Sequence, residues 1–226
     1  MNTDPAEKIT YTIAISGGMG RVGRALAHRF AREGHTVIFT YHSHSSRDAR
    51  KFLKSLPSKK HYACMCDITN SVQVREGIAA AAKKRGPIHI AINAAATPIA
   101  RKDTAHISPT VFRQQFEVTT FGALNFFQAV IPHMTKDGRS KIIGLTAAEI
   151  EPGVVAGNMA GYVSAKYALR GILRELAYEL SASQIAVCAV APTSVEPEDL
   201  AEAIALITPQ SYEEVNDRSF SIKNIP

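Results

Sequence analysis

Apolar residues gather in short runs that alternate with longer amphipathic stretches along the whole chain. The apolar runs cover residues 11–15, 36–40, 61–65, 88–92, 141–145 and 185–190. The stretches with helical periodicity cover about residues 20–33, 46–56, 71–85, 109–134 and 159–183. Near-continuous apolar runs are typical of parallel strands that are covered on both faces. The alternation therefore predicts an α/β fold, a single Rossmann-type doubly wound parallel sheet flanked by helices.

Length and composition agree with one domain. The chain has 226 residues, of which 46% are apolar and 20% charged, and no repeat or linker divides it. This size suffices for one sizeable core, so we treat residues 1–226 as a single domain. The formal net charge is +6, and the basic residues are scattered. Such a distribution favours an anionic cofactor over nucleic acid as the binding partner.

The cysteines and the start of the chain exclude several other classes. Three cysteines lie in apolar runs, which indicates no disulfide framework and favours a reducing, cytoplasmic setting. Cys64 and Cys66 with His61 lack a second ligand cluster, so no metal site is expected. Residues 1–8 are polar, and no apolar run reaches about 18 residues, so we expect neither a signal peptide nor a membrane span.

A glycine-rich turn follows the first apolar run and leads into a helical stretch. Glycines allow a tight turn, and they let backbone N–H groups and the helix N-terminus approach a pyrophosphate. A plain packing turn is the alternative, but the strand–turn–helix context favours dinucleotide binding. The predicted cofactor contacts in this turn are Gly17, Gly18, Met19, Gly20, Arg21, Val22 and Gly23.

The segment after the second apolar run indicates which dinucleotide is bound. No Asp or Glu stands between Thr36 and Arg47. A carboxylate there would bind the ribose hydroxyls and repel a 2′-phosphate, whereas hydroxyls and an arginine would accept that phosphate. NADP(H) is therefore preferred over NAD(H). The predicted contacts are Tyr41, His42, Ser43, Ser45 and Arg47, with Arg21 as a further phosphate contact.

Tyr162 and Lys166 are four residues apart in a helical stretch, so they share one helix face. A buried cation beside a phenol favours the phenolate, and we expect Lys166 to lower the pKa of Tyr162 from about 10. Tyr162 could then exchange a proton with a substrate oxygen. The alternative is a core tyrosine and a solvated lysine that happen to share a helix.

Taken in order, four motifs resemble the short-chain dehydrogenase/reductase family over about residues 13–192. They are the glycine turn, Asp67, Asn93-Ala94-Ala95 and Tyr162-x-x-x-Lys166. The resemblance implies that Asp67 and Ile68 contact the adenine and that the segment Asn93, Ala94 and Ala95 passes the cofactor. It implies Tyr162 as catalytic acid/base and Lys166 as the residue that binds the nicotinamide ribose. Pro192 and Thr193 would lie near the nicotinamide.

Several positions depart from the family pattern. Arg21 in the glycine turn resembles pteridine reductases, and the Gly-Gly-x-Gly-x-x-Gly spacing resembles dihydropteridine reductase. The family's catalytic serine aligns with Ala147, and Thr146 just before it is the candidate substitute hydroxyl. The family's asparagine in the fifth helix aligns with Thr119.

The region that normally encodes substrate choice is largely missing after about residue 195. Glu198 and Asp199 resemble the family's late helix start, and both suit the positive N-terminal end of a helix. The tail from residue 211 lacks the usual Gly-Gly ending.

The sequence thus predicts an NADP(H)-dependent oxidoreductase that reduces a carbonyl or imine-like small molecule, with pterin-type compounds among the candidates. Two alternatives stay open: an NADP(H)-binding sensor or partner subunit with little redox turnover, and a non-redox acid/base enzyme. A homodimer or homotetramer is expected, because the stretches 109–134 and 159–183 resemble the family's dimer-forming helices.

Overall fold

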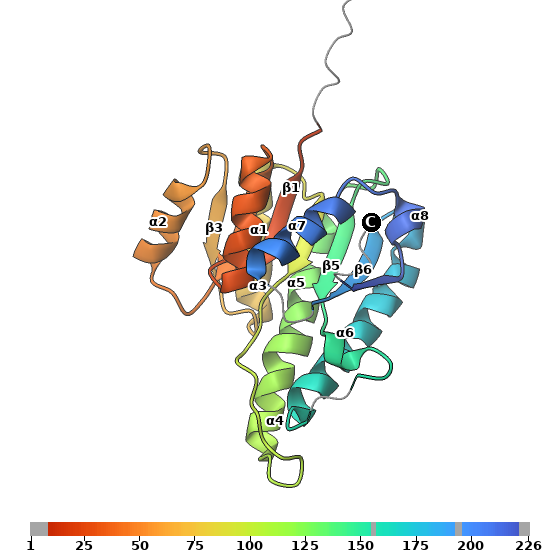
Figure 1. Cartoon of the computed structure of the whole chain (residues 1–226). Coiled ribbons are helices and arrows are strands. Elements are labelled where there is room, and N and C mark those ends of the chain that lie inside the picture. Colours follow the sequence, from red (N-terminus) through yellow and green to blue (C-terminus); the bar gives the residue numbers. More distant parts are fainter. Residues whose placement is uncertain (1–8, 155–156, 193–195, 222–226) are drawn as a thin grey trace, which may run out of the picture.

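The computed structural model describes residues 9–154, 157–192 and 196–221, in which seven strands form one parallel sheet (Figure 1). The strands are β1 (Thr12–Ser16), β2 (Thr36–Tyr41), β3 (Tyr62–Met65), β4 (Ile90–Asn93), β5 (Lys141–Leu145), β6 (Ala186–Ala191) and β7 (Arg218–Ser221). Their order is β3-β2-β1-β4-β5-β6-β7. The chain reverses its direction of travel between β1 and β4, so the switch point, where such sheets bind ligands, lies there. The predicted Rossmann-type fold is confirmed.

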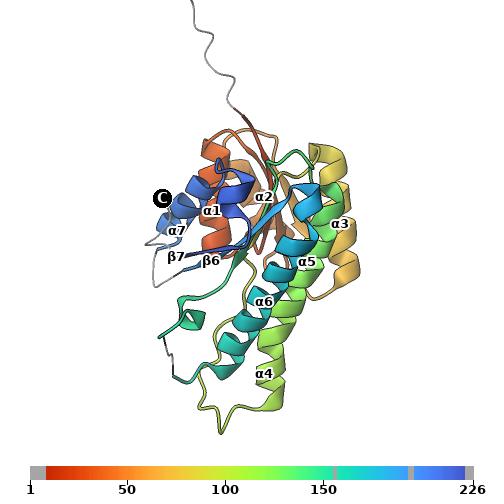
Figure 2. The same ribbon diagram turned by 90° about the vertical axis from the view of Figure 1, so that its right-hand side faces the viewer.

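Helices cover both faces of this sheet, as Figure 2 shows. They are α1 (Arg21–Arg32), α2 (Ser46–Ser55), α3 (Ser71–Arg85), α4 (Pro109–Phe116), α5 (Gly122–Val130), α6 (Ala160–Glu179), α7 (Pro197–Ile207) and α8 (Tyr212–Val215). Alternate residues of β1 face opposite layers: Ile13 and Ile15 join the core under α1, α2 and α7, and Ala14 joins the core under α3, α5 and α6. This two-sided burial explains why the strands are apolar at nearly every position.

The predicted helix over residues 109–134 is wrong in detail, because it consists of several pieces. A π-helical turn, Glu117–Phe121, separates α4 from α5, and a 3-10 turn, Ile131–His133, follows α5. β-branched residues at positions 118–120 crowd a regular helix, and Pro132 restricts the residue before it. π-turns are often found at functional sites, and this one contacts α6.

The C-terminal part contains elements that the apolar runs did not predict. β7 pairs with β6 and extends the sheet, although Phe220 is its one buried residue. α7 begins as the acidic residues indicated: Glu196 is its N-cap, and Glu198 and Asp199 lie in its first turn. The described helices include none that is both long and apolar enough to cross a membrane.

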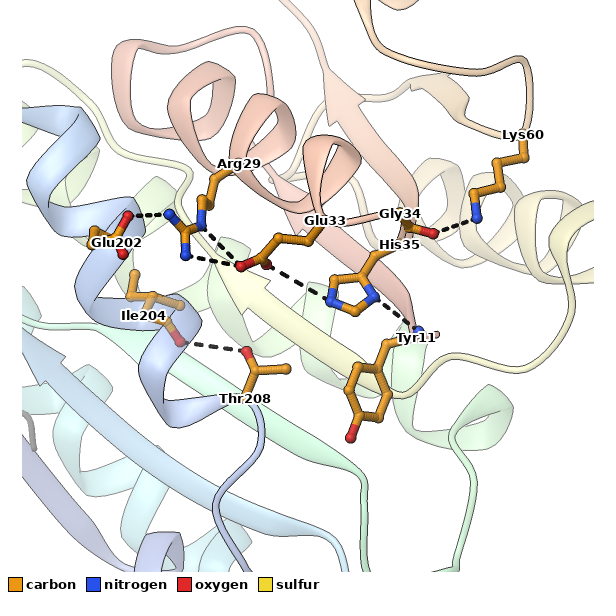
Figure 3. Close-up of polar contacts among 9 residues, drawn as sticks. All are labelled: Tyr11, Arg29, Glu33, Gly34, His35, Lys60, Glu202, Ile204 and Thr208. Atoms are coloured by element: carbon orange, nitrogen blue, oxygen red, sulfur yellow. Dashed lines mark hydrogen bonds and ion pairs between the residues drawn. The ribbon is translucent and has the colours of Figure 1, made fainter. Parts of the chain in front are cut away.

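A polar cluster joins α1 to α7 at the edge of the sheet where the strands begin (Figure 3). Arg29 donates Nε–H to Glu33 Oε1 at 3.1 Å and forms an ion pair with Glu202 of α7. Glu33 Oε2 lies 3.8 Å from His35 Nε2, and the Tyr11 N–H donates to His35 Nδ1 at 3.2 Å. The cluster joins these elements at the amino ends of the strands and leaves the carboxyl ends of the strands for binding.

Candidate active site

A cleft of about 630 Å³ lies at the carboxyl ends of β1 to β4, beside the switch point. The predicted cofactor residues that line it are Gly17, Met19, Gly20, Arg21, Val22, Tyr41, His42, Ser43, Asp67, Ile68, Ala94 and Ala95. Segments from four parts of the sequence thus meet around one space. Further lining residues, Thr40, His44, Cys66, Ala96, Thr97, Pro98 and Val118, were not predicted.

The glycine turn is closely packed. Gly17 has φ +66°, and a Cβ on it would lie 2.7 Å from Ala95 Cα. A Cβ on Gly23 would lie 2.3 Å from the Gly17 carbonyl oxygen, so α1 can start directly against the turn only with glycine there. The N-cap of α1, Gly20, has no side-chain cap, which leaves the N–H groups of the first turn for a ligand. This cradle fits a pyrophosphate, and the fit supports a dinucleotide in the cleft.

Two hydroxyl residues that the sequence analysis missed hold the turn in place. Ser16 is fully buried; its Oγ donates to Asn93 Oδ1 at 2.6 Å and accepts the Ala95 N–H at 3.1 Å. Thr40 Oγ1 accepts the Gly17 N–H at 3.3 Å. Asn93 is therefore buried behind the cleft, where it links β1 to β4. A small polar residue at the last position of a strand was the only sequence signal for Ser16.

The far end of the cleft has one acidic side chain, Asp67. Asp67 Oδ1 accepts two hydrogen bonds from Thr69, from its N–H and its hydroxyl, and Oδ2 lies 3.8 Å from His42 Nε2. Burial opposes ionisation, but the bonds from Thr69 and the charge of His42 hold the pKa of Asp67 below its ordinary value. A carboxylate acceptor in the wall of the cleft suits an amino group such as that of adenine.

The predicted phosphate contacts divide into two groups. Arg21, His42 and Ser43 line the cleft, and Arg21 lies 3.5 Å from Glu196 at the start of α7. Ser45 and Arg47 do not line it. Ser45 is the N-cap of α2, where its Oγ accepts the Asp48 N–H at 3.1 Å. The Ser45 hydroxyl is thus committed to the helix, as is usual for serine before a helix.

Tyr162 and Lys166 lie on the first turns of α6, but they do not pair as expected. Lys166 is buried and donates Nζ–H to the Leu145 carbonyl oxygen at 2.6 Å, with Nζ 5.7 Å from the centre of the Tyr162 ring. Burial lowers the pKa of Lys166 to about 8, and burial with the charge of Glu149 raises the pKa of Tyr162 to about 12. The prediction of a lowered pKa at Tyr162 was wrong, because burial and the charge of Glu149 both raise it.

The hydroxyl expected to replace the family's serine points elsewhere. Thr146 Oγ1 donates to the Val190 carbonyl oxygen at 3.2 Å, so its proton is committed to β6. Ala147 is buried, and Thr119 is buried within the π-turn. The prediction of Thr146 as a substitute donor therefore has no support in this geometry. Pro192 directly follows β6, and its carbonyl oxygen accepts the Ala148 N–H at 3.3 Å. Thr193 lies outside the described residues.

Glu149 is the residue near the candidate catalytic pair that the sequence analysis missed. It lies in a 3-10 turn, Ala148–Ile150, which begins two residues after the end of β5. Its negative charge adds to the raised pKa of Tyr162 and opposes the larger lowering that burial causes in the pKa of Lys166. The described residues contain no cluster of three or more His, Cys, Asp or Glu side chains that could hold a metal ion.

Comparison with known proteins assigns the class. A family model described as "Enoyl-(Acyl carrier protein) reductase" matches residues 19–223. The chain belongs to the short-chain dehydrogenase/reductase family. It is similar to the 7alpha-hydroxysteroid dehydrogenase of Escherichia coli (strain K12), with 26% identity over 87% of this chain and 74% of that protein. It is also similar to the 3-ketodihydrosphingosine reductase of Bacteroides thetaiotaomicron, with 29% identity over 80% of this chain and 62% of that protein.

Solved structures share the fold. A dehydrogenase/reductase from Sinorhizobium meliloti 1021 matches with a TM-score of 0.84 and 20% identity, over 93% of this chain and 92% of that chain. A 3-ketoacyl-(acyl-carrier-protein) reductase from Brucella melitensis complexed with NADH matches with a TM-score of 0.83 and 21% identity, over 93% and 96%. A blue fluorescent protein from a metagenomic library in complex with NADPH matches with a TM-score of 0.83 and 22% identity, over 93% and 95%.

Proposed function

We propose that this family member is an NADP(H)-dependent oxidoreductase that reduces a carbonyl or imine-like small molecule, with pterin-type compounds among the candidates. The observation that carries the cofactor preference is the end of β2. His42 and Ser43 line the cleft there, Arg21 lines the same cleft, and no carboxylate stands between Thr36 and Arg47. Imidazole, hydroxyl and guanidinium groups suit a 2′-phosphate.

The chain's own residues have separate tasks in this proposal. The bound dinucleotide supplies the hydride when it is present. Gly17 and the first turn of α1 hold its pyrophosphate, Asp67 its adenine and Lys166 its nicotinamide ribose. Tyr162 donates a proton to the substrate heteroatom. With a pKa of about 12, Tyr162 keeps its proton at neutral pH, which suits the acid role and the direction of reduction.

A second candidate function is NADP(H) binding with little turnover, as a sensor or partner subunit. Ala147 supports it, because a methyl group cannot donate a hydrogen bond to a developing oxyanion, and so does the commitment of the Thr146 hydroxyl to Val190. Losing one such donor costs on the order of 3 kcal/mol in a transition state that depends on it. A non-redox acid/base enzyme is a third candidate.

The test follows NADPH oxidation with panels of quinonoid, ketone and imine acceptors. The parent protein should oxidise NADPH with at least one acceptor, and Tyr162→Phe should lower that rate roughly 100-fold or more. Tyr178→Phe is the matched control, because Tyr178 lies on the same helix and is 82% exposed. Tight NADPH binding with no oxidation by any acceptor would refute the reductase proposal and leave the binding function.

We also propose that the protein works as a homodimer or homotetramer in the cytoplasm. Phe121 on the π-turn and Tyr167 on α6 are large, half-exposed side chains on adjoining helical segments, which supports burial against a second copy. Sedimentation of the parent and of Phe121→Ser measures the oligomeric state directly.

A further inference from the structure

A cavity of about 300 Å³ lies at the amino ends of β2 and β3, whereas the cofactor cleft lies at their carboxyl ends. The end of α2, the loop before β3 and the end of α3 supply its lining, which consists of Leu53, Lys54, Ser58, Lys59, His61 and Arg85. The cavity and the cleft share no lining residue. β2 has six residues, so at roughly 3.3 Å per residue about 20 Å separate its two ends. The cavity is therefore a separate space from the cofactor cleft.

The lining of this cavity is strongly basic. It contains Lys54, Lys59 and Arg85, and no Asp or Glu belongs to it. Within the part of the chain that the structure describes, none of these three side chains forms an ion pair. The carbonyl ends of α2 and α3 lie nearby and carry about half a negative charge each, which three full positive charges outweigh. The cavity should therefore attract anions.

Arg85 has a donor that suits an oxyanion. The residue is half-buried, and its Nε atom is buried with no acceptor among the described residues. A buried N–H without an acceptor is unfavourable, because it has given up its hydrogen bonds to water. A guanidinium can bind an oxyanion through two parallel N–H donors. An anion in the cavity could satisfy the Arg85 Nε–H in this way.

The loop that carries Lys59 is anchored to β2. His61 is buried, and its Nδ1 accepts the Val37 N–H at 3.1 Å. The ring proton therefore lies on Nε2, and the neutral ring adds no charge to the cavity. Lys60 donates to the Gly34 carbonyl oxygen, as Figure 3 shows, so its ammonium is committed to the turn before β2. Lys59, between these two anchored residues, extends from a fixed backbone.

A phosphate monoester matches these groups better than a carboxylate does. It carries a charge of about −1.5 to −2 at neutral pH and has three strong acceptor oxygens. These suit one guanidinium and two ammonium groups, whereas a carboxylate offers one charge and two oxygens. Leu53 and the methylene groups of Lys54 provide apolar surface for the organic part of the ester.

We propose that this cavity binds the phosphate group of a small phosphate monoester, through Arg85 on its buried side and Lys54 and Lys59 at its exposed rim. The site would be distinct from the one that holds the dinucleotide. The inference therefore goes beyond the proposed reductase function and does not depend on it.

Calorimetry with two probes of one shape tests the ligand class. Phenyl phosphate and benzenesulfonate both present three oxygens on a phenyl ring, but the sulfonate carries only one negative charge. The parent protein should bind phenyl phosphate with a Kd below about 1 mM, and it should bind benzenesulfonate about tenfold or more weakly. Equal Kd values, or no binding of phenyl phosphate, would overturn the inference.

Substitutions at two arginines locate the probe. Arg85→Gln should raise the Kd of phenyl phosphate about tenfold or more, and Arg85→Lys should recover only part of the loss, because lysine keeps the charge but not the fork. Arg21 lines the cofactor cleft, so Arg21→Gln should leave this Kd unchanged. If Arg21→Gln weakens binding and Arg85→Gln does not, the probe occupies the cofactor cleft and the inference fails.

A pair of double variants tests the site without changing its buried part. Lys54→Gln combined with Lys59→Gln removes two exposed charges of the lining and should raise the Kd about tenfold or more. Lys51→Gln combined with Lys83→Gln is the matched control, because it removes two exposed charges from α2 and α3 outside the lining. The control should change the Kd less than about twofold. Equal rises in both double variants would show a general attraction to a basic surface and overturn the inference.

Discussion

Replacing Lys166 with methionine should change how the stability of the fold depends on pH. Lys166 is buried, and among the described residues its ammonium has one hydrogen-bond acceptor, the Leu145 carbonyl, at 2.6 Å. Burial lowers its pKa from 10.5 to about 8. At pH 7 the folded chain therefore holds a charge whose burial costs roughly 3 kcal/mol, a cost that methionine would not carry.

The sign follows from proton counting. Between pH 8 and 10.5 the unfolded chain binds more protons at Lys166 than the folded chain does, so the unfolding free energy of the parent rises with pH through this window. The remaining cost at pH 10 is roughly 1 kcal/mol. The stability of Lys166→Met relative to the parent should thus decrease by roughly 2 kcal/mol from pH 7 to pH 10. The bond lost to Leu145 costs about 1–3 kcal/mol and is common to both pH values.

Urea unfolding followed by circular dichroism at pH 7, 8, 9 and 10 measures this difference. In thermal unfolding, the same difference of roughly 2 kcal/mol would appear as a Tm shift of about 4–8 °C for a domain of this size. Lys83→Met is the control, because Lys83 is exposed on α3, and its curve should run parallel to that of the parent. If Lys166→Met also runs parallel to the parent, the lysine is not held at an energetic cost and the reasoning fails.

Two further substitutions test the cofactor cleft. Gly17→Ala should destabilise the fold and weaken NADPH binding, because φ at Gly17 is +66° and the new Cβ would lie 2.7 Å from Ala95 Cα. Gly138→Ala is the control, because φ there is +77° but no atom lies within 4 Å of the new Cβ. This control should lose only about 1–2 kcal/mol of stability and no affinity for NADPH. Equal losses of Tm in the two variants would contradict the packing argument. Ser43→Asp should weaken NADPH binding at least tenfold relative to NADH binding in fluorescence titrations. Ser71→Asp adds the same charge at the start of α3, at a residue that does not line the cleft, and should leave this ratio unchanged. An unchanged ratio would remove the end of β2 from the 2′-phosphate site.

The elements that the sequence predicted well are those with a strong apolar pattern. The bounds of β1 to β6 each agree with those of an apolar run to within two residues, because a strand buried on both faces needs apolar side chains throughout. β7 escaped prediction because it is a short edge strand with one buried side chain, Phe220. The break in the helix at residues 117–121 escaped prediction because this turn packs against α6, a contact that periodicity does not show.

For the site, prediction from the sequence was limited in a different way. Motif spacing correctly brought Asp67 and Ala95 to the same cleft as the glycine turn, since the carboxyl ends of parallel strands lie along one edge. Spacing could not show which way a side chain turns or what else reaches it. The Thr146 hydroxyl donates to the Val190 carbonyl of β6, and the Ser45 hydroxyl caps α2 by accepting the Asp48 N–H.

The candidate catalytic pair shows why this limit matters for function. The shared helix face of Tyr162 and Lys166 predicted a lysine that acidifies the tyrosine, but buried groups respond to all nearby charges and to lost solvation. Here burial disfavours both charged forms, so the tyrosine holds its proton and the lysine gives its own up near pH 8. A pair in this state can donate a proton and is poorly suited to remove one.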